Sequence, residues 1–185
     1  MPHTPVDPAA LTADLIRCPS VTPIEGGALV LLQTLLSNAG FTCTRVDRNG
    51  TANLYARWGA KGANKSFGFN GHTDVVPVDG QPWSVPPFEL TERDGRLFGR
   101  GTADMKGYIA CVLALVPALV AATLRRPVHI ALSYDEEVGC LGVRSLLSVL
   151  AQRPVKPMLC IIGEPTELKP VLGHKGKLAM RCDVH

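Results

Sequence analysis

The sequence predicts an α/β fold, with a twisted and largely parallel mixed sheet flanked by helices. Segments with helical periodicity alternate along the chain with short apolar segments, an order typical of a sheet covered by helices. Two apolar segments, residues 128–134 and 158–162, show little alternation and are expected to be strands buried on both faces. With 185 residues, 46% hydrophobic and 19% charged, the chain can bury a core and is too apolar to be disordered.

Four segments are predicted to be helices. Residues 7–17 begin with Asp7, a good N-cap residue, and Pro8, which suits the first turn. Residues 25–38 place leucines along one face and stop before Gly40. The other two helices are expected over residues 105–122 and 141–152.

Short segments that are apolar, or that alternate between apolar and polar residues, are predicted to be strands. They cover residues 41–46, 53–58, 66–70, 128–134, 158–162 and 178–185. Turn-forming residues occur at Asn49-Gly50 and at residues 59–64, and a proline-rich loop spans residues 75–89.

Composition excludes several kinds of partner. A formal net charge of +3 is too small to indicate a nucleic-acid partner. The uncharged run at residues 108–122 is too short for a membrane span and contains Pro117, and the N-terminus lacks a signal-peptide pattern, so a cytoplasmic protein is expected.

The six cysteines form no C-x-x-C pair and are expected to be buried free thiols. No phosphate-binding loop for a nucleotide cofactor is found.

Acidic and imidazole side chains follow three of the predicted strands, and another opens the third predicted helix. These residues are His72, Asp74, Asp104, Glu136, Glu137 and Glu164. In an open α/β sheet, ligands bind at the carboxyl ends of the strands. We therefore expect these residues, which lie far apart in the sequence, to converge on one rim of the sheet.

Metal binding is the chemistry that such a cluster needs. Packed carboxylates repel one another, and a divalent cation removes that penalty. Imidazole and carboxylate ligands without thiolate suit zinc, cobalt or manganese. The supply of carboxylates fits two ions, with one carboxylate shared between them and a water activated as the nucleophile. Asp74 follows His72 by two positions and can be the partner that orients its imidazole.

Each of these residues also has a structural interpretation. Taken alone, His72 could be a structural histidine, Asp104 a helix N-cap and Glu164 a surface residue. The acidic run at residues 135–137 is by itself typical of a solvated turn. Their shared position at strand ends favours the metal site. His129, in contrast, falls inside an apolar strand and is expected to be a core residue.

Four motifs stand out along the chain. They are Gly-His-Thr-Asp-Val-Val-Pro at 71–77, Leu-Phe-Gly-Arg-Gly-Thr-Ala-Asp-Met-Lys-Gly at 97–107, Asp-Glu-Glu at 135–137 and Gly-Glu-Pro-Thr at 163–166. In order and approximate spacing they resemble the motifs of the co-catalytic zinc amidohydrolases. That family includes acetylornithine deacetylases, succinyl-diaminopimelate desuccinylases, aminoacylases and carboxypeptidase-like members. The resemblance implies a zinc-peptidase-like catalytic domain with two divalent metal ions, zinc first and cobalt as the alternative.

The resemblance also implies a role for each candidate residue. His72 and Glu164 resemble ligands of the first metal, and Glu137 resembles a ligand of the second. Asp104 resembles the carboxylate that bridges the two metals. Asp74 resembles the residue that orients His72, and Glu136 resembles the general base. A glutamate that is not tied to metal can titrate, whereas its metal-bound neighbour is a poor base. Family members also tend to hold a cis peptide bond just after the bridging aspartate, here between Asp104 and Met105.

Within the family, residues 163–176 look most like the acetylornithine deacetylases, because they end in His174-Lys175-Gly176 where desuccinylases usually carry Arg-Arg-Gly. The implied reaction is hydrolysis of N-acetylornithine to ornithine and acetate, in arginine biosynthesis, by a homodimer acting on a small N-acyl amino acid. Succinyl-diaminopimelate desuccinylase or a general aminoacylase is the alternative enzyme. An inactive metal-binding fragment is the alternative outside the enzymes.

Family members are longer than this chain. They carry a smaller domain for dimerisation and substrate contacts after a strand like residues 178–185, and the catalytic domain then resumes and supplies a last histidine ligand. We therefore expect residues 1–177 to be the N-terminal part of a truncated catalytic domain, and residues 178–185 to begin the strand that leads to the second domain.

Overall fold

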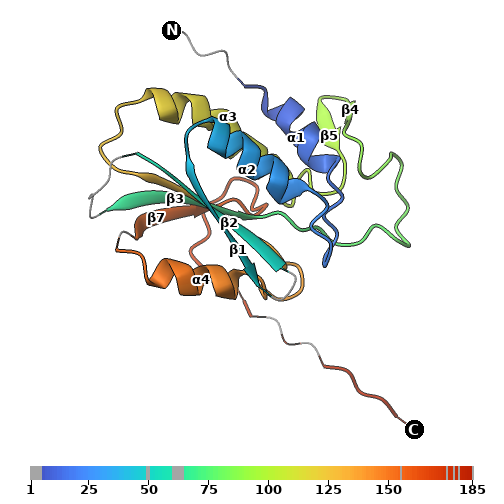
Figure 1. The fold of residues 1–185 in the computed structure, drawn as a ribbon. Coiled ribbons are helices and arrows are strands. Elements are labelled where there is room, and N and C mark those ends of the chain that lie inside the picture. Colours follow the sequence, from blue (N-terminus) through green and yellow to red (C-terminus); the bar gives the residue numbers. More distant parts are fainter. Residues whose placement is uncertain are drawn as a thin grey trace.

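The computed structural model describes residues 6–48, 51–59, 65–154, 156–173, 175–176, 178 and 180–184. Its main sheet has five strands in the order β1-β2-β6-β3-β7 (Figure 1). They are β1 (Thr42–Arg48), β2 (Thr51–Trp58), β3 (Ser66–His72), β6 (Val128–Ser133) and β7 (Pro157–Ile162). Strand β2 pairs antiparallel with β1 and β6, whereas β3 pairs parallel with β6 and β7. Four of these strands therefore run in one direction, and the predicted mixed, mostly parallel sheet is confirmed.

Helices lie on both faces of this sheet (Figure 1). On one face lie α1 (Pro8–Ile16), α2 (Ala28–Asn38) and α3 (Lys106–Ala121), and on the other α4 (Val143–Ala151) contacts β1 and β2. A separate hairpin is formed by β4 (Thr91–Arg93) and β5 (Arg96–Phe98). The core lies between the three-helix layer and the sheet and includes the buried side chains of Leu15, Leu29, Leu32, Leu36, Leu54, Ile109, Ile130 and Leu132. In the part of the chain that the structure describes, no helix has the length and apolar character needed to cross a membrane.

Two of the predicted helix signals are seen, the cap of α1 at Asp7 and the glycine after α2 at Gly40. The Asp7 carboxylate accepts the backbone N–H of Ala9 at 2.9 Å, so it caps α1. Helix α2 has Gly27 as its N-cap residue, without a side-chain cap, and the Glu25 carboxylate accepts the backbone N–H of Leu29 in its first turn. Gly40 follows α2 with a φ of +90°, a left-handed conformation that glycine adopts without steric cost.

The prediction that the strand at residues 158–162 is buried is wrong. All six residues of β7 are exposed, although they are mostly apolar. The reason is position, because β7 is the edge strand and β3 is its one neighbour in the described sheet. The strand predicted over residues 178–185 is also not seen, since residues 178 and 180–184 pair with no strand of the described chain.

The prediction for the cysteines is half right. All six are unpaired, as expected, but none is fully buried. Four are exposed, namely Cys111, Cys140, Cys160 and Cys182. Cys160 is exposed because it lies on β7. The predicted turn at Asn49-Gly50, residues 60–64 of the second turn and His174 lie outside the described residues.

Candidate metal centre

The carboxyl ends of three parallel strands bring the candidate residues to one rim of the sheet. His72 is the last residue of β3, and Glu164 follows β7 closely. Glu136 and Glu137 follow β6, and Asp104 lies in the loop that leads into α3. Since β6, β3 and β7 are parallel neighbours, their carboxyl ends share one edge. The expected convergence on one rim is therefore seen.

The imidazole of His72 is held in one orientation at the centre of this rim. The side chain is only 1% exposed, and its Nδ1 lies 2.9 Å from the backbone carbonyl oxygen of Asp74. A carbonyl oxygen can only accept a hydrogen bond, so Nδ1 carries the proton. The Asp74 carboxylate, to which the sequence assigns the orienting role, is farther away at 3.5 Å. Nε2 is therefore the nitrogen that is left for a metal ion.

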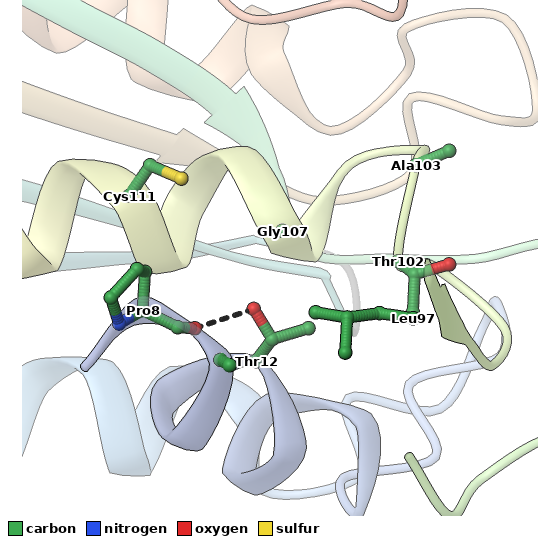
Figure 2. Close-up of a pocket in the computed structure, with 8 residues that line it drawn as sticks. Pro8, Thr12, Leu97, Thr102, Ala103, Gly107 and Cys111 are labelled. Atoms are coloured by element: carbon green, nitrogen blue, oxygen red, sulfur yellow. Dashed lines mark hydrogen bonds between the residues drawn. The ribbon is translucent and has the colours of Figure 1, made fainter. Parts of the chain in front are cut away.

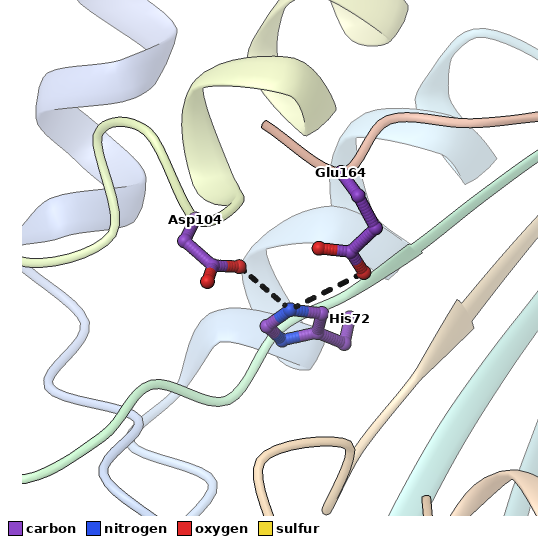
Figure 3. A group of neighbouring side chains, drawn as sticks. All are labelled: His72, Asp104 and Glu164. Carbon is purple, nitrogen blue, oxygen red and sulfur yellow. Dashed lines mark hydrogen bonds and ion pairs between the residues drawn. The ribbon is translucent and has the colours of Figure 1, made fainter. Parts of the chain in front are cut away.

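Carboxylates surround that free nitrogen. Nε2 of His72 lies 3.0 Å from Asp104 and 3.9 Å from both Glu164 and Glu136. Figure 3 shows Asp104 and Glu164 approaching the ring from two segments that are distant in the sequence. One donor atom each from His72, Asp104 and Glu164 lies within 4.8 Å of the others. This spacing and this mixture of imidazole and carboxylate fit a divalent cation of the zinc type.

The electrostatics of the rim also favour a cation. Burial lowers the pKa of His72, but the interactions with Asp74, Glu164 and Asp104 outweigh burial and raise it to about 9. An imidazole with that pKa is surrounded by enough negative charge to hold a proton firmly. A divalent cation would take the place of that proton and offset the repulsion between the carboxylates.

The two adjacent glutamates are placed differently. Glu136 has one carboxylate oxygen 3.9 Å from His72 Nε2 and the other 3.4 Å from the thiol of Cys140, which donates to it. Glu137 is outside the tight group formed by His72, Asp104 and Glu164. Burial raises the pKa of Glu137, and Asp104 is the strongest of the charges that raise it further. The charges of Asp104 and Glu137 therefore interact.

Asp74 has a contact that the sequence did not reveal. Its carboxylate is fully buried and accepts the backbone N–H of Glu136 at 3.2 Å and that of Glu137 at 3.1 Å. One carboxylate on the β3 side thus holds the main chain of both glutamates on the β6 side. Only the tertiary structure brings these segments together, so no local sequence signal could predict this contact.

Lys106 lies in the site region, although the sequence predicts no role for it. Its side chain is fully buried at the start of α3, and its ammonium group donates to the backbone carbonyl of Cys18 at 2.6 Å. Burial lowers the pKa of Lys106 to about 8, against the opposing effects of Cys18 and Asp74. A lysine at the start of an otherwise apolar helix was a signal that could have marked it. The peptide bond between Asp104 and Met105 is cis, as the family resemblance implies.

A separate hollow of about 400 Å³ is lined in part by the loop that precedes α3. It is lined by residues of α1, β5 and α3, together with Thr102 and Ala103 of the loop before α3 (Figure 2). Its lining is mostly apolar, and it contains none of the six candidate site residues. The candidate chemistry is therefore at the open rim rather than in this hollow.

Sequence comparison identifies relatives over most of the chain. A family model described as peptidase family M20/M25/M40 matches residues 68–177. Succinyl-diaminopimelate desuccinylase from Cereibacter sphaeroides is 53% identical over 165 residues, covering 88% of this chain and 43% of the relative. The enzyme of the same name from Paracoccus denitrificans is 47% identical and covers 98% of this chain and 50% of the relative. The chain thus spans about half the length of these curated relatives.

Solved structures share the fold at lower sequence identity. A metallo-carboxypeptidase of the M20 family from Sulfolobus solfataricus superposes with a TM-score of 0.75 at 22% identity, covering 85% of this chain and 37% of that one. Human carnosine dipeptidase 1 gives a TM-score of 0.73 at 24% identity, covering 84% of this chain and 38% of that one. At this identity the likeness supports the fold alone.

Proposed function

Because the chain belongs to peptidase family M20/M25/M40, we propose that it carries most of the metal site of an amidohydrolase that removes the succinyl group from succinyl-diaminopimelate. The observation that carries this substrate is the set of curated relatives named above, which are 47–53% identical and share one activity. These relatives favour the desuccinylase alternative over the deacetylation of N-acetylornithine that the sequence motifs favour. They give no support to a role in arginine biosynthesis.

N-acetylornithine is kept as the second candidate substrate for one reason. Residues 174–176 read His-Lys-Gly, which resembles the acetylornithine deacetylases at a position where desuccinylases usually carry Arg-Arg-Gly. Both candidates are amides of a small amino acid, so the proposed metal chemistry is the same for either. The choice therefore depends on the parts of the site that contact the acyl group and the amino-acid side chain.

We propose His72 and Glu164 as ligands of one metal ion, Asp104 as a ligand shared by two ions, and Glu137 as a ligand of the second. The cluster of His72, Asp104 and Glu164 supports the first assignment, and the influence of Asp104 on the pKa of Glu137 supports the others. When bound, two divalent ions would polarise the scissile carbonyl and make a water molecule more acidic. Zinc fits these ligands first, and cobalt is the alternative.

The protein's own contribution to the reaction is proton transfer and orientation. Glu136 is the proposed general base, which takes the proton from the attacking water and passes it to the leaving amine. One of its oxygens faces His72, and the thiol of Cys140 anchors the other. Asp74 fixes the main chain of Glu136 and Glu137, so the base and the neighbouring ligand keep separate directions.

The proposed domain organisation follows from the same membership. Residues 1–177 would be the N-terminal part of a catalytic domain, and residues 178–185 would lead to a second domain that serves substrate contacts and dimerisation. The exposed apolar face of β7 supports this proposal, because it is a surface that further parts of the protein could cover.

The test is a substrate comparison with the full-length, zinc-loaded protein. We expect kcat/KM for succinyl-diaminopimelate to exceed that for N-acetylornithine by at least about tenfold, which corresponds to roughly 1.4 kcal/mol of discrimination. The opposite preference would assign the protein to the acetylornithine deacetylases. Turnover of neither substrate would overturn the proposed function.

A further inference from the structure

A loop from the N-terminal part of the chain binds three of the segments that carry the site. We call residues 18–22 the bracket loop. Ser20 donates its hydroxyl to the carbonyl of Thr73 at 2.5 Å and accepts the N–H of Val75 on its own carbonyl at 3.0 Å. Cys18 accepts the ammonium group of Lys106. The bracket loop therefore joins the segment after β3 to the start of α3.

The third contact of the bracket loop is made by Thr22. Its hydroxyl donates to the carboxylate of Asp135 at 2.7 Å, across 113 positions of sequence. Asp135 is only 7% exposed and directly precedes Glu136. This hydrogen bond is a specific contact, because a buried carboxylate that loses its donor costs more free energy than a neutral hydrogen bond contributes.

The backbone of Asp135 needs such a contact. Its φ is +57°, in the left-handed region that residues other than glycine rarely adopt, although aspartate tolerates it better than most. The carbonyl of Asp135 accepts the N–H of Leu141 at 2.9 Å, which closes the turn behind it. The left-handed residue sets the direction in which the next two residues leave β6.

Those next two residues are the proposed base and the proposed second-metal ligand. Asp74 holds the N–H groups of Glu136 and Glu137 from the β3 side, and Thr22 holds the side chain of Asp135 from the bracket loop. The segment is thus fixed from two independent directions. A small rotation at Asp135 would move both glutamate side chains together.

We propose that Thr22 and Asp135 form a positioning pair, which aims Glu136 and Glu137 at the metal centre without touching substrate or metal. This inference rests on the proposed function, because it takes the roles of the two glutamates from it. Loss of the pair should act on the second metal and on kcat, and spare the first metal, whose proposed ligands His72 and Glu164 lie on other strands.

The experiment uses the full-length protein and four variants. Thr22→Val removes the hydroxyl and keeps the shape, while Thr22→Ser keeps the hydroxyl. Asp135→Asn keeps both an acceptor oxygen and the tolerance for a left-handed backbone. Thr34→Val is the matched control, because Thr34 donates its hydroxyl within α2, to the carbonyl of Val30. Zinc binding is followed by isothermal titration calorimetry, stability by thermal unfolding, and turnover by steady-state kinetics.

We expect Thr22→Val to weaken the second zinc about tenfold and to lower kcat by about 10- to 100-fold, which is the size of a lost hydrogen bond to a buried charge. KM should change by less than about threefold. Thr22→Ser should restore both values, Asp135→Asn should fall between Thr22→Val and the wild type, and Thr34→Val should match the wild type.

Three outcomes would overturn the positioning pair. Unchanged second-zinc affinity in Thr22→Val would do so, as would equal loss of both zinc ions, or failure of Thr22→Ser to restore them. The zinc titration measures the affinity for the second zinc even if the wild type turns over neither candidate substrate. A failure of the proposed function is therefore distinguishable from a failure of the pair.

Discussion

Strands β6 and β7 flank β3 on its two sides and run parallel to it, yet their surroundings differ. Both are apolar, but β6 is buried at five of its six positions and β7 is exposed at all six. β6 lies between two strands under the three-helix layer, whereas β7 is the edge strand of the described sheet. Apolar composition is therefore the same in a strand that is buried and in one that is exposed, and it does not by itself predict burial.

The difference extends to the site, because each strand delivers part of it. β6 leads to Glu136 and Glu137, whose main chain is held by Asp74. β7 leads to Glu164, and its carboxyl end is held by α3, where Tyr108 donates its hydroxyl to the carbonyl of Ile161 at 2.8 Å. The β6 side is therefore fixed by buried charged contacts, and the β7 side by a contact at the surface.

The largest expected effects are on kcat and on zinc content, and they differ between the glutamate after β6 and the glutamate after β7. Glu136→Gln, on the β6 side, should lower kcat by about 10²- to 10⁴-fold and retain zinc, because a general base contributes about that much without holding metal. Glu164→Gln, on the β7 side, should lose zinc, because a neutral amide is a poorer ligand. Zinc content and kcat are measured together. Should Glu136→Gln release zinc while Glu137→Gln retains it, the two adjacent glutamates have exchanged roles.

The next effect concerns stability. Ile130→Ala in β6 removes a side chain that is 1% exposed and should lower the free energy of unfolding by about 2–5 kcal/mol. Ile161→Ala in β7 removes one that is 44% exposed and should cost roughly 1 kcal/mol or less. Urea unfolding of the 185-residue chain measures both. Equal losses would contradict the contrast between the strands.

A pH effect on stability is expected from a buried histidine of β6. Burial first, and then the charges of Arg57 and Arg153, lower the pKa of His129 to about 4, whereas in the unfolded chain it is near 6.5. The unfolded chain therefore binds the extra proton between pH 6.5 and 4, so stability should fall as the pH drops through that range and level off below it. The loss is on the order of 3 kcal/mol at most. In His129→Phe this part of the slope should disappear, and its persistence would assign the slope to other groups.

The smallest effect tests how the end of β7 is held. Tyr108→Phe removes the hydroxyl that donates to the carbonyl of Ile161 and keeps the aromatic ring. The ring packs so closely against Gly163 that a side chain at position 163 would collide with it. We expect a loss of about 1 kcal/mol in stability. We also expect a few-fold weaker affinity for the first zinc, since Glu164 directly follows Gly163. Tyr55→Phe is the control, because its hydroxyl bonds His129 within the sheet. An equal loss of zinc affinity in both variants would exclude a specific role for Tyr108.

The rim of the site could be predicted from the sequence because it follows from strand ends and chain order. Once β3, β6 and β7 are parallel neighbours, His72, Glu136 and Glu164 must meet at one edge. The contacts that support the rim could not be predicted in the same way. The bond from Thr22 to Asp135 spans 113 positions, and either residue alone has an ordinary local interpretation as a loop or turn residue.

Burial was less predictable for a related reason. His129 is buried as the sequence predicts, because β6 has neighbours on both edges and helices above it. Cys160 lies in an equally apolar segment and is exposed, because β7 has β3 on one edge only in the described sheet. Composition describes the strand itself, whereas exposure depends on everything placed around it.

The hydrogen bond from His72 to position 74 has a consequence for mutational tolerance. Its acceptor is a main-chain carbonyl, and every amino acid at position 74 supplies one. The tautomer of His72 is therefore insulated from changes in the side chain of Asp74. A saturation library at this position would not be expected to release the histidine. Substitutions at position 74 should instead remove the acceptor for the N–H groups of Glu136 and Glu137. A change after β3 would therefore be detected as a change in the position of the two glutamates after β6.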